Sequence, residues 1–154
     1  MQEPYWELAQ RGVSFADGAT TADLEEQLGQ SCAMIVATPG TEVIFDRCPL
    51  DFVAYLEVVS HEEGFEWEPD GKMLRQIEKA VGSLDLLAFV PLATPDEIEV
   101  SIEHPKLRVR VDRRLKALIR NDEMELLGGK PRVVEIGGTR PVRVRKLASA
   151  LTRR

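Results

Sequence analysis

The sequence predicts an α/β fold, a three-layer parallel sheet with flanking helices. Three hydrophobic runs, near residues 42–46, 84–91 and 132–137, have the length of strands and are bounded by turn-forming residues. Segments with helical periodicity separate these runs. Strands that alternate with helices usually form parallel sheets with right-handed crossovers, so we expect one layered domain over residues 1–154.

Two helices are predicted before the first strand. Pro4 suits the first turn of a helix that runs to Arg11. Thr20 or Thr21 can cap a second helix, because acidic residues that favour a helix N-terminus follow directly. The apolar positions of this second helix continue to about Val36.

The central stretch, Glu42–Leu56, reads as a strand followed by a helix. Val43–Phe45 is a run of β-branched and aromatic residues, and Asp46 and Arg47 follow it. Pro49 then opens a helix with an apolar face. Ligands of open α/β sheets bind at the carboxyl ends of the strands, so this Asp-Arg pair is a candidate site.

The remaining elements follow from periodicity and turn residues. We expect a helix over 70–81, a buried strand within 84–92, an edge strand over 97–102, a helix over 107–121, and a strand over 132–136. Thr139 is predicted to cap the last helix, which has Pro141 near its start. The buried side of that helix is predicted to comprise Val142, Val144, Leu147, Ala148 and Leu151.

Composition excludes several classes of protein. No apolar run approaches the roughly 20 residues that a membrane helix needs, and the first ten residues carry no basic segment typical of a signal peptide. Cys32 and Cys48 are the only cysteines, and no CxxC motif or Cys/His cluster exists. We therefore expect a cytoplasmic protein with two reduced thiols and no metal site.

Charge is distributed unevenly along the chain. Residues 1–103 hold 5 Lys/Arg against 21 Asp/Glu, whereas residues 104–154 hold 15 Lys/Arg against 5 Asp/Glu. A basic C-terminal third indicates an anionic partner, either a nucleotide phosphate or a nucleic acid. The alternative is that the two oppositely charged parts of the chain neutralise each other in the fold.

Three segments, Glu3–Trp6, Phe45–Asp51 and Glu135–Val142, carry a resemblance to a known family. In order along the chain, they resemble the nucleoside and nucleotide kinase-like branch of the P-loop NTPases, which includes small AAA-type ATP-binding proteins. Glu3-Pro4-Tyr5-Trp6 resembles the segment after the second strand of deoxynucleoside kinases. Phe45-Asp46-Arg47-Cys48-Pro49-Leu50-Asp51 resembles the Asp/Glu-Arg-Ser motif after the third strand. Glu135-Ile136-Gly137-Gly138-Thr139-Arg140-Pro141-Val142 resembles the final strand and turn.

The resemblance implies roles for particular residues. It makes Glu3 the base for the acceptor hydroxyl and Asp46 and Arg47 the acceptor-side pair. The turn at Gly137, Gly138, Thr139 and Pro141 would lie against the adenine. A lid-like basic segment, about 104–122, would close over the transferred phosphate through Arg108, Arg110, Arg113 and Arg114.

Each of these residues also has a structural interpretation. Asp46 and Arg47 can form a surface ion pair, and Glu3 can be an acid at a helix N-terminus. The arginines of residues 104–122 can be a solvated helix face, Gly137-Gly138 can be only a tight turn, and Tyr5 and Trp6 can belong to the core.

The chain departs from the family at the P-loop. No G-x-x-x-x-G-K-[ST] sequence, whose backbone and Lys bind the phosphates of ATP, occurs in the 154 residues. The resemblance places a strand, the P-loop, a helix and a second strand before Glu3, about 30–40 residues at usual element lengths. We therefore expect Met1 to be an internal start, a true truncation or the start of a degenerate relative.

The sequence thus predicts an ATP- and Mg²⁺-dependent, kinase-like NTPase domain that is inactive alone. Its predicted partners are a nucleotide and a small phosphate acceptor. Without the family's first strand, Val43–Phe45 and the strand near 84–91 must pair directly, leave a gap, or accept another strand, so homo-oligomers through unpaired sheet edges are also expected. The alternative function is a non-catalytic module that binds nucleic acid or an acidic partner through the basic third.

Overall fold

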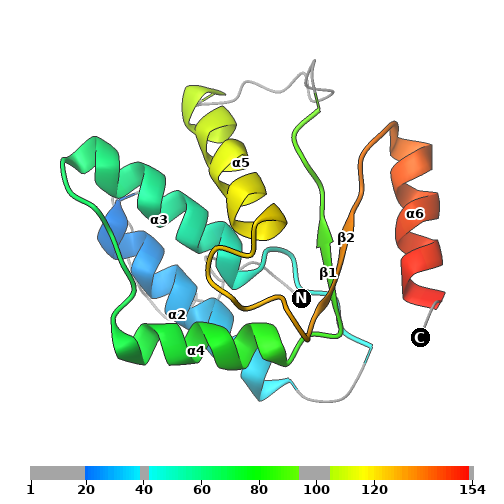
Figure 1. The fold of residues 1–154 in the computed structure, drawn as a ribbon, viewed down its shortest axis with the longest axis horizontal. Helices are drawn as coiled ribbons and strands as arrows, with labels where there is room; N and C mark the ends of the chain where they lie inside the picture. The colour runs from blue at the N-terminus through cyan, green and yellow to red at the C-terminus, as the bar shows by residue number, and fades with distance from the viewer. Residues whose placement is uncertain (1–19, 39–41, 94–104, 153–154) are drawn as a thin grey trace.

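The computed structural model describes residues 20–38, 42–93 and 105–152. Within them the chain forms five helices and two strands (Figure 1). In chain order these are α2 (Thr21–Ala37), α3 (Pro49–Glu63), α4 (Gly71–Gly82), β1 (Leu86–Phe89), α5 (Pro105–Arg120), β2 (Arg132–Glu135) and α6 (Arg140–Thr152). The predicted helix from Pro4 to Arg11 and the predicted edge strand over 97–102 lie outside the described residues.

The predicted three-layer parallel sheet is wrong. The described residues are mostly helical, and the sheet has two short strands, β1 and β2, in parallel. Residues 42–46 were predicted as a strand but do not form one. The helix predicted to follow them is present as α3. A strand exists only where a neighbour completes its hydrogen-bond ladder. Ile44 is 68% exposed and Phe45 is only partly buried against the helical core, so this run is not enclosed as a central strand would be.

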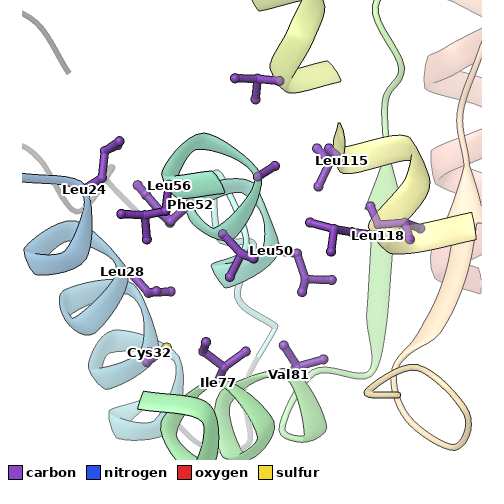
Figure 2. Packing of buried hydrophobic residues seen from close by; sticks show 14 of the residues in the cluster. Leu24, Leu28, Cys32, Leu50, Phe52, Leu56, Ile77, Val81, Leu115 and Leu118 are labelled. Carbon is purple, nitrogen blue, oxygen red and sulfur yellow. The ribbon is translucent and has the colours of Figure 1, made fainter. Parts of the chain in front are cut away.

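Helix α3 is the centre of the core. It packs against α2, α4 and α5, and nine of its fifteen residues are buried. Figure 2 shows Leu50, Phe52 and Leu56 of α3 among apolar side chains from the neighbouring helices. A helix that is apolar nearly all round must be enclosed, which explains why three other helices surround it.

Helices α2 and α4 each begin directly after a residue whose side chain caps the first turn. Thr20 caps α2, since its hydroxyl accepts a hydrogen bond from the Asp23 N–H at 3.2 Å. Asp70 caps α4 by accepting from the Met73 N–H at 2.7 Å. The link between α3 and α4 is fixed by Trp67, whose indole donates to a carboxylate oxygen of Glu25 at 2.6 Å.

The two strands are shorter than the runs predicted over 84–91 and 132–137. Their register pairs Leu86 with Arg132 and Phe89 with Glu135. Leu87 and Phe89 are buried on the face toward the helical core, whereas Ala88 on the opposite face is exposed. The parallel direction of these two strands agrees with the prediction.

Helix α6 lies beside β2, away from the other helices (Figure 1). The predicted buried side of this helix is wrong. Val144 is 61% exposed and Leu151 is 52% exposed, and Ala150 is the buried residue of the helix. Val142 and Val144 are two positions apart, a spacing that places them on different sides of a helix, so they cannot share one buried stripe.

Candidate functional site

The best candidate site residues, Asp46 and Arg47, lie in the turn between residues 42–45 and α3. Both are exposed. Arg47 has a left-handed backbone with φ of 70°, a conformation that costs a residue with a side chain about 1 kcal/mol or more. Its guanidinium lies over the ring of Tyr55, 5.6 Å from the centroid. The cation–π contact orients the arginine along the first turns of α3.

The N-terminus of α3 follows directly and is already occupied by a side chain. Asp51 accepts a hydrogen bond from the Cys48 N–H at 2.8 Å. Burial raises the pKa of Asp51, while that hydrogen bond and Arg47 oppose the rise. Because Asp51 already accepts from the Cys48 N–H, that amide is not available to a ligand at this turn, and the charged donor there is Arg47.

Both cysteines lie near α3 but neither has the properties of a nucleophile. Burial raises the pKa of the Cys32 thiol to about 12, and burial also raises the pKa of Cys48 well above its usual value. Because their pKa values are raised, both thiols stay protonated at neutral pH. Only the thiolate form attacks a substrate or binds a metal. Neither Cys32 nor Cys48 forms a disulfide in the structure.

The predicted adenine-binding turn connects β2 to α6. Gly138 has φ of 105°, and a Cβ built on it would lie 3.1 Å from Val142, so glycine suits this position on two grounds. The Gly137 carbonyl accepts a hydrogen bond from Lys146 at 3.1 Å, and the Thr139 carbonyl accepts from the Arg143 N–H at 2.9 Å. These contacts make a tight strand-to-helix turn, and Thr139 and Pro141 at its end are exposed.

The predicted lid arginines lie on one continuous helix, α5, which packs along α3. Arg110 pairs with Glu62 of α3, and Arg114 pairs with both Glu57 of α3 and Glu123. The hydrogen bond to Glu57 is the main reason that the pKa of Arg114 is raised. Arg113 is exposed and Arg108 is half-buried.

These ion pairs place the lid arginines away from the Arg47 turn. Glu57 and Glu62 follow Pro49, the first residue of α3, by 8 and 13 positions, or about 12 and 20 Å along the helix axis at 1.5 Å per residue. A phosphate near Arg47 would therefore have to draw Arg110 and Arg114 from existing partners. Sequence reasoning missed the acidic partners, although acids on α3 and cations on α5 are a recognisable complementary pattern.

The remaining predictions concern Glu3, a metal site and membrane-spanning helices. Glu3, the predicted base, lies outside the described residues. Among the described residues, no group of three or more His, Cys, Asp or Glu side chains could hold a metal ion. No helix within the described part of the chain is long and apolar enough to cross a membrane.

Comparison with known proteins adds no relative. No family model, curated protein or solved structure matches the chain.

Proposed function

We propose that the chain carries the acceptor side of a kinase-like, ATP-dependent phosphoryl-transfer site, in which Arg47 binds the phosphate or phosphate-like end of the acceptor. The left-handed backbone of Arg47 is the observation that carries this proposal. Strained conformations at non-glycine residues persist where the surrounding structure maintains them, and they cluster at functional sites. Three non-glycine residues of the described chain have a positive φ, namely Arg47, Asp122 and Glu125, and the first of them is the one that the resemblance to nucleotide kinases selected.

The chemistry follows from the properties of a guanidinium. Arg47 can donate two parallel hydrogen bonds to a phosphate, and the Tyr55 ring beneath it limits the side chain's freedom. Asp46 beside it can accept from an acceptor hydroxyl. Because no P-loop sequence occurs in the 154 residues, we expect weak binding of MgATP and no catalysis by this chain alone.

The test is an NMR titration of the full chain with AMP, comparing wild type with Arg47→Gly. Glycine tolerates the left-handed backbone, so this variant removes the guanidinium without adding strain. We expect amide shifts centred on residues 46–48 and a roughly tenfold or greater loss of affinity in the variant, as expected for one charge-assisted contact. Arg75→Ala, at an exposed arginine of α4, is the control and should bind like wild type.

Unchanged AMP affinity in Arg47→Gly would refute the assignment. Equal losses in Arg47→Gly and Arg75→Ala would indicate non-specific attraction of an anion. Tight MgATP binding by the chain, measured calorimetrically, would contradict the expectation that the phosphate cradle is missing.

A second candidate function is binding of nucleic acid through α6. This helix carries four cationic residues and no acidic one, listed here as Arg140, Arg143, Arg145 and Lys146. Arg140 and Arg145 are exposed and have no ion-pair partner among the described residues. Unneutralised cations at a molecular surface are what a phosphate backbone requires.

Fluorescence anisotropy with a labelled single-stranded DNA tests this second function. We expect Arg145→Gln to weaken binding and to reduce the slope of log affinity against log salt by about 0.7 if the residue contacts one phosphate. Arg113→Gln, an exposed arginine of α5, is the matched control and should leave both quantities unchanged. Binding that both variants weaken equally would exclude a specific role for α6.

A further inference from the structure

Within the part of the chain that the structure describes, strand β1 has one paired edge and one open edge. Along the paired edge, the Arg132 N–H donates to the Asp85 carbonyl at 3.1 Å, and the Ile136 N–H donates to the Phe89 carbonyl at 2.7 Å. Backbone groups alternate in direction along a strand, so residues 85, 87 and 89 are directed toward β2. The N–H and C=O groups of Leu86, Ala88 and Val90 are therefore directed away from β2.

The open edge has no paired strand among the described residues. Within the described residues, the sheet consists of β1 and β2, and residues 42–45, which the sequence predicted as a strand, do not belong to it. Ala88 is exposed and Val90 is 53% exposed, so the side chains on the outer face of this strand are not covered. Unpaired strand edges are templates for another extended chain.

The edge also lacks the usual protection against pairing. Natural edge strands often carry charged side chains, a bulge or a proline that blocks a partner. Residues 86–90 are all apolar, and the first interruption is Pro91 at the C-terminal end. The unprotected edge is therefore a short segment of five residues.

We propose that the open edge of β1 pairs with the same edge of a second copy of this chain, antiparallel and centred on Ala88. In this register Ala88 faces Ala88 of the partner subunit, and Leu86 faces Val90 of the partner subunit. Because all three residues direct their backbone groups outward, the pairing makes about six main-chain hydrogen bonds and joins the two sheets into one of four strands.

The sequence of the edge favours a second copy as the occupant. Two-fold pairing about Ala88 matches apolar residues with apolar residues at every position. Asp85, whose side chain is 95% exposed, lies beyond the paired segment. The two Asp85 residues are separated by about six strand positions, roughly 20 Å, so their like charges do not oppose the pairing.

The test measures the dimer by sedimentation velocity over a wide range of protein concentration. We expect wild type to form a weak dimer and Ala88→Pro to be monomeric. The Ala88 N–H is directed away from β2, so proline removes an outward donor while leaving the ladder to β2 intact. Val144→Lys on α6 is the matched control, because it removes a similarly exposed apolar side chain elsewhere and should leave the dimer unchanged.

A second pair of variants tests the register and does not depend on how well proline is tolerated. Ala88→Lys and Ala88→Glu should each be monomeric, because like charges would face each other about 5.5 Å apart at their Cα atoms. Mixing the two variants should restore a heterodimer. Circular dichroism of each variant establishes that it is folded.

Three outcomes would overturn the proposal. The first is a wild type that stays monomeric at every concentration. The second is a dimer that Val144→Lys abolishes and Ala88→Pro does not. The third is a mixture of folded Ala88→Lys and Ala88→Glu that stays monomeric.

Discussion

Helices α5 and α6 are both cationic and of similar length, but they contact the rest of the molecule very differently. Helix α5 carries seven Lys/Arg residues in sixteen, and α6 carries four in thirteen. On α5, four apolar residues at helical spacing are buried, namely Val111, Leu115, Leu118 and Ile119. On α6, the apolar residues are distributed around the helix, and Ala150 is the buried one.

The two helices also differ in how their cationic side chains are paired. Arg110, Arg114 and Arg120 of α5 each contact a carboxylate on another part of the chain. Arg140 and Arg145 of α6 form no salt bridge with another described residue. Spacing of apolar residues, rather than composition, thus decides whether a basic helix docks and is neutralised or keeps its cations at the surface.

The largest expected contrast between the two helices is in their leucines. Leu118→Ala should lower the free energy of unfolding by about 2–5 kcal/mol, because Leu118 is 2% exposed and its loss leaves a cavity. Leu151→Ala should change it by no more than about 0.5 kcal/mol, since that side chain is 52% exposed. Urea denaturation measures both values, and equal losses would mean that α6 is docked as firmly as α5.

A smaller contrast is expected for the arginines. Arg114→Gln should cost about 1–2 kcal/mol, because it leaves Glu57 and Glu123 without a partner at a partly buried position. Arg145→Gln should be close to neutral in the same denaturation experiment. A stability loss confined to Arg145→Gln would reverse the distinction between the two helices.

The smallest effect is the dependence of stability on pH. Hydrogen bonds from Arg114 and Arg120 lower the pKa of Glu123 and of Glu135 in the folded state. A lowered folded pKa adds stability above the unfolded pKa, about 4.3, and that stability is lost as the pH falls through the folded value. Urea midpoints against pH should therefore decline in acid.

A double variant, Glu123→Gln with Glu135→Gln, serves as the comparison for the acid decline. Its urea midpoint should depend less on pH than that of wild type over the same acidic range. Arg145→Gln in α6 should follow the wild-type profile, because no carboxylate of the described residues pairs with Arg145. Identical profiles for wild type and the double variant would show that these two ion pairs do not anchor α5.

Sequence alone determined the helices whose signals are local. Thr20, one of the two predicted caps, precedes α2, the helix predicted over 70–81 corresponds to α4, and the helix predicted over 107–121 corresponds to α5. Capping needs only a side chain and the next few amides, and an amphipathic stripe needs only the correct spacing. The parallel direction of β1 and β2 was also predicted, because a helix separates the two strands, but the sequence did not predict that these two strands pair with each other.

Tertiary structure alone decided the rest. Whether residues 43–45 become a strand depends on a neighbouring chain that completes the hydrogen bonds, and the apolar run cannot supply one. Whether the α5 arginines bind a ligand or Glu57 and Glu62 depends on how α5 packs along α3. The left-handed backbone of Arg47 likewise depends on how the turn before α3 is held, because nothing in the identity of an arginine favours it.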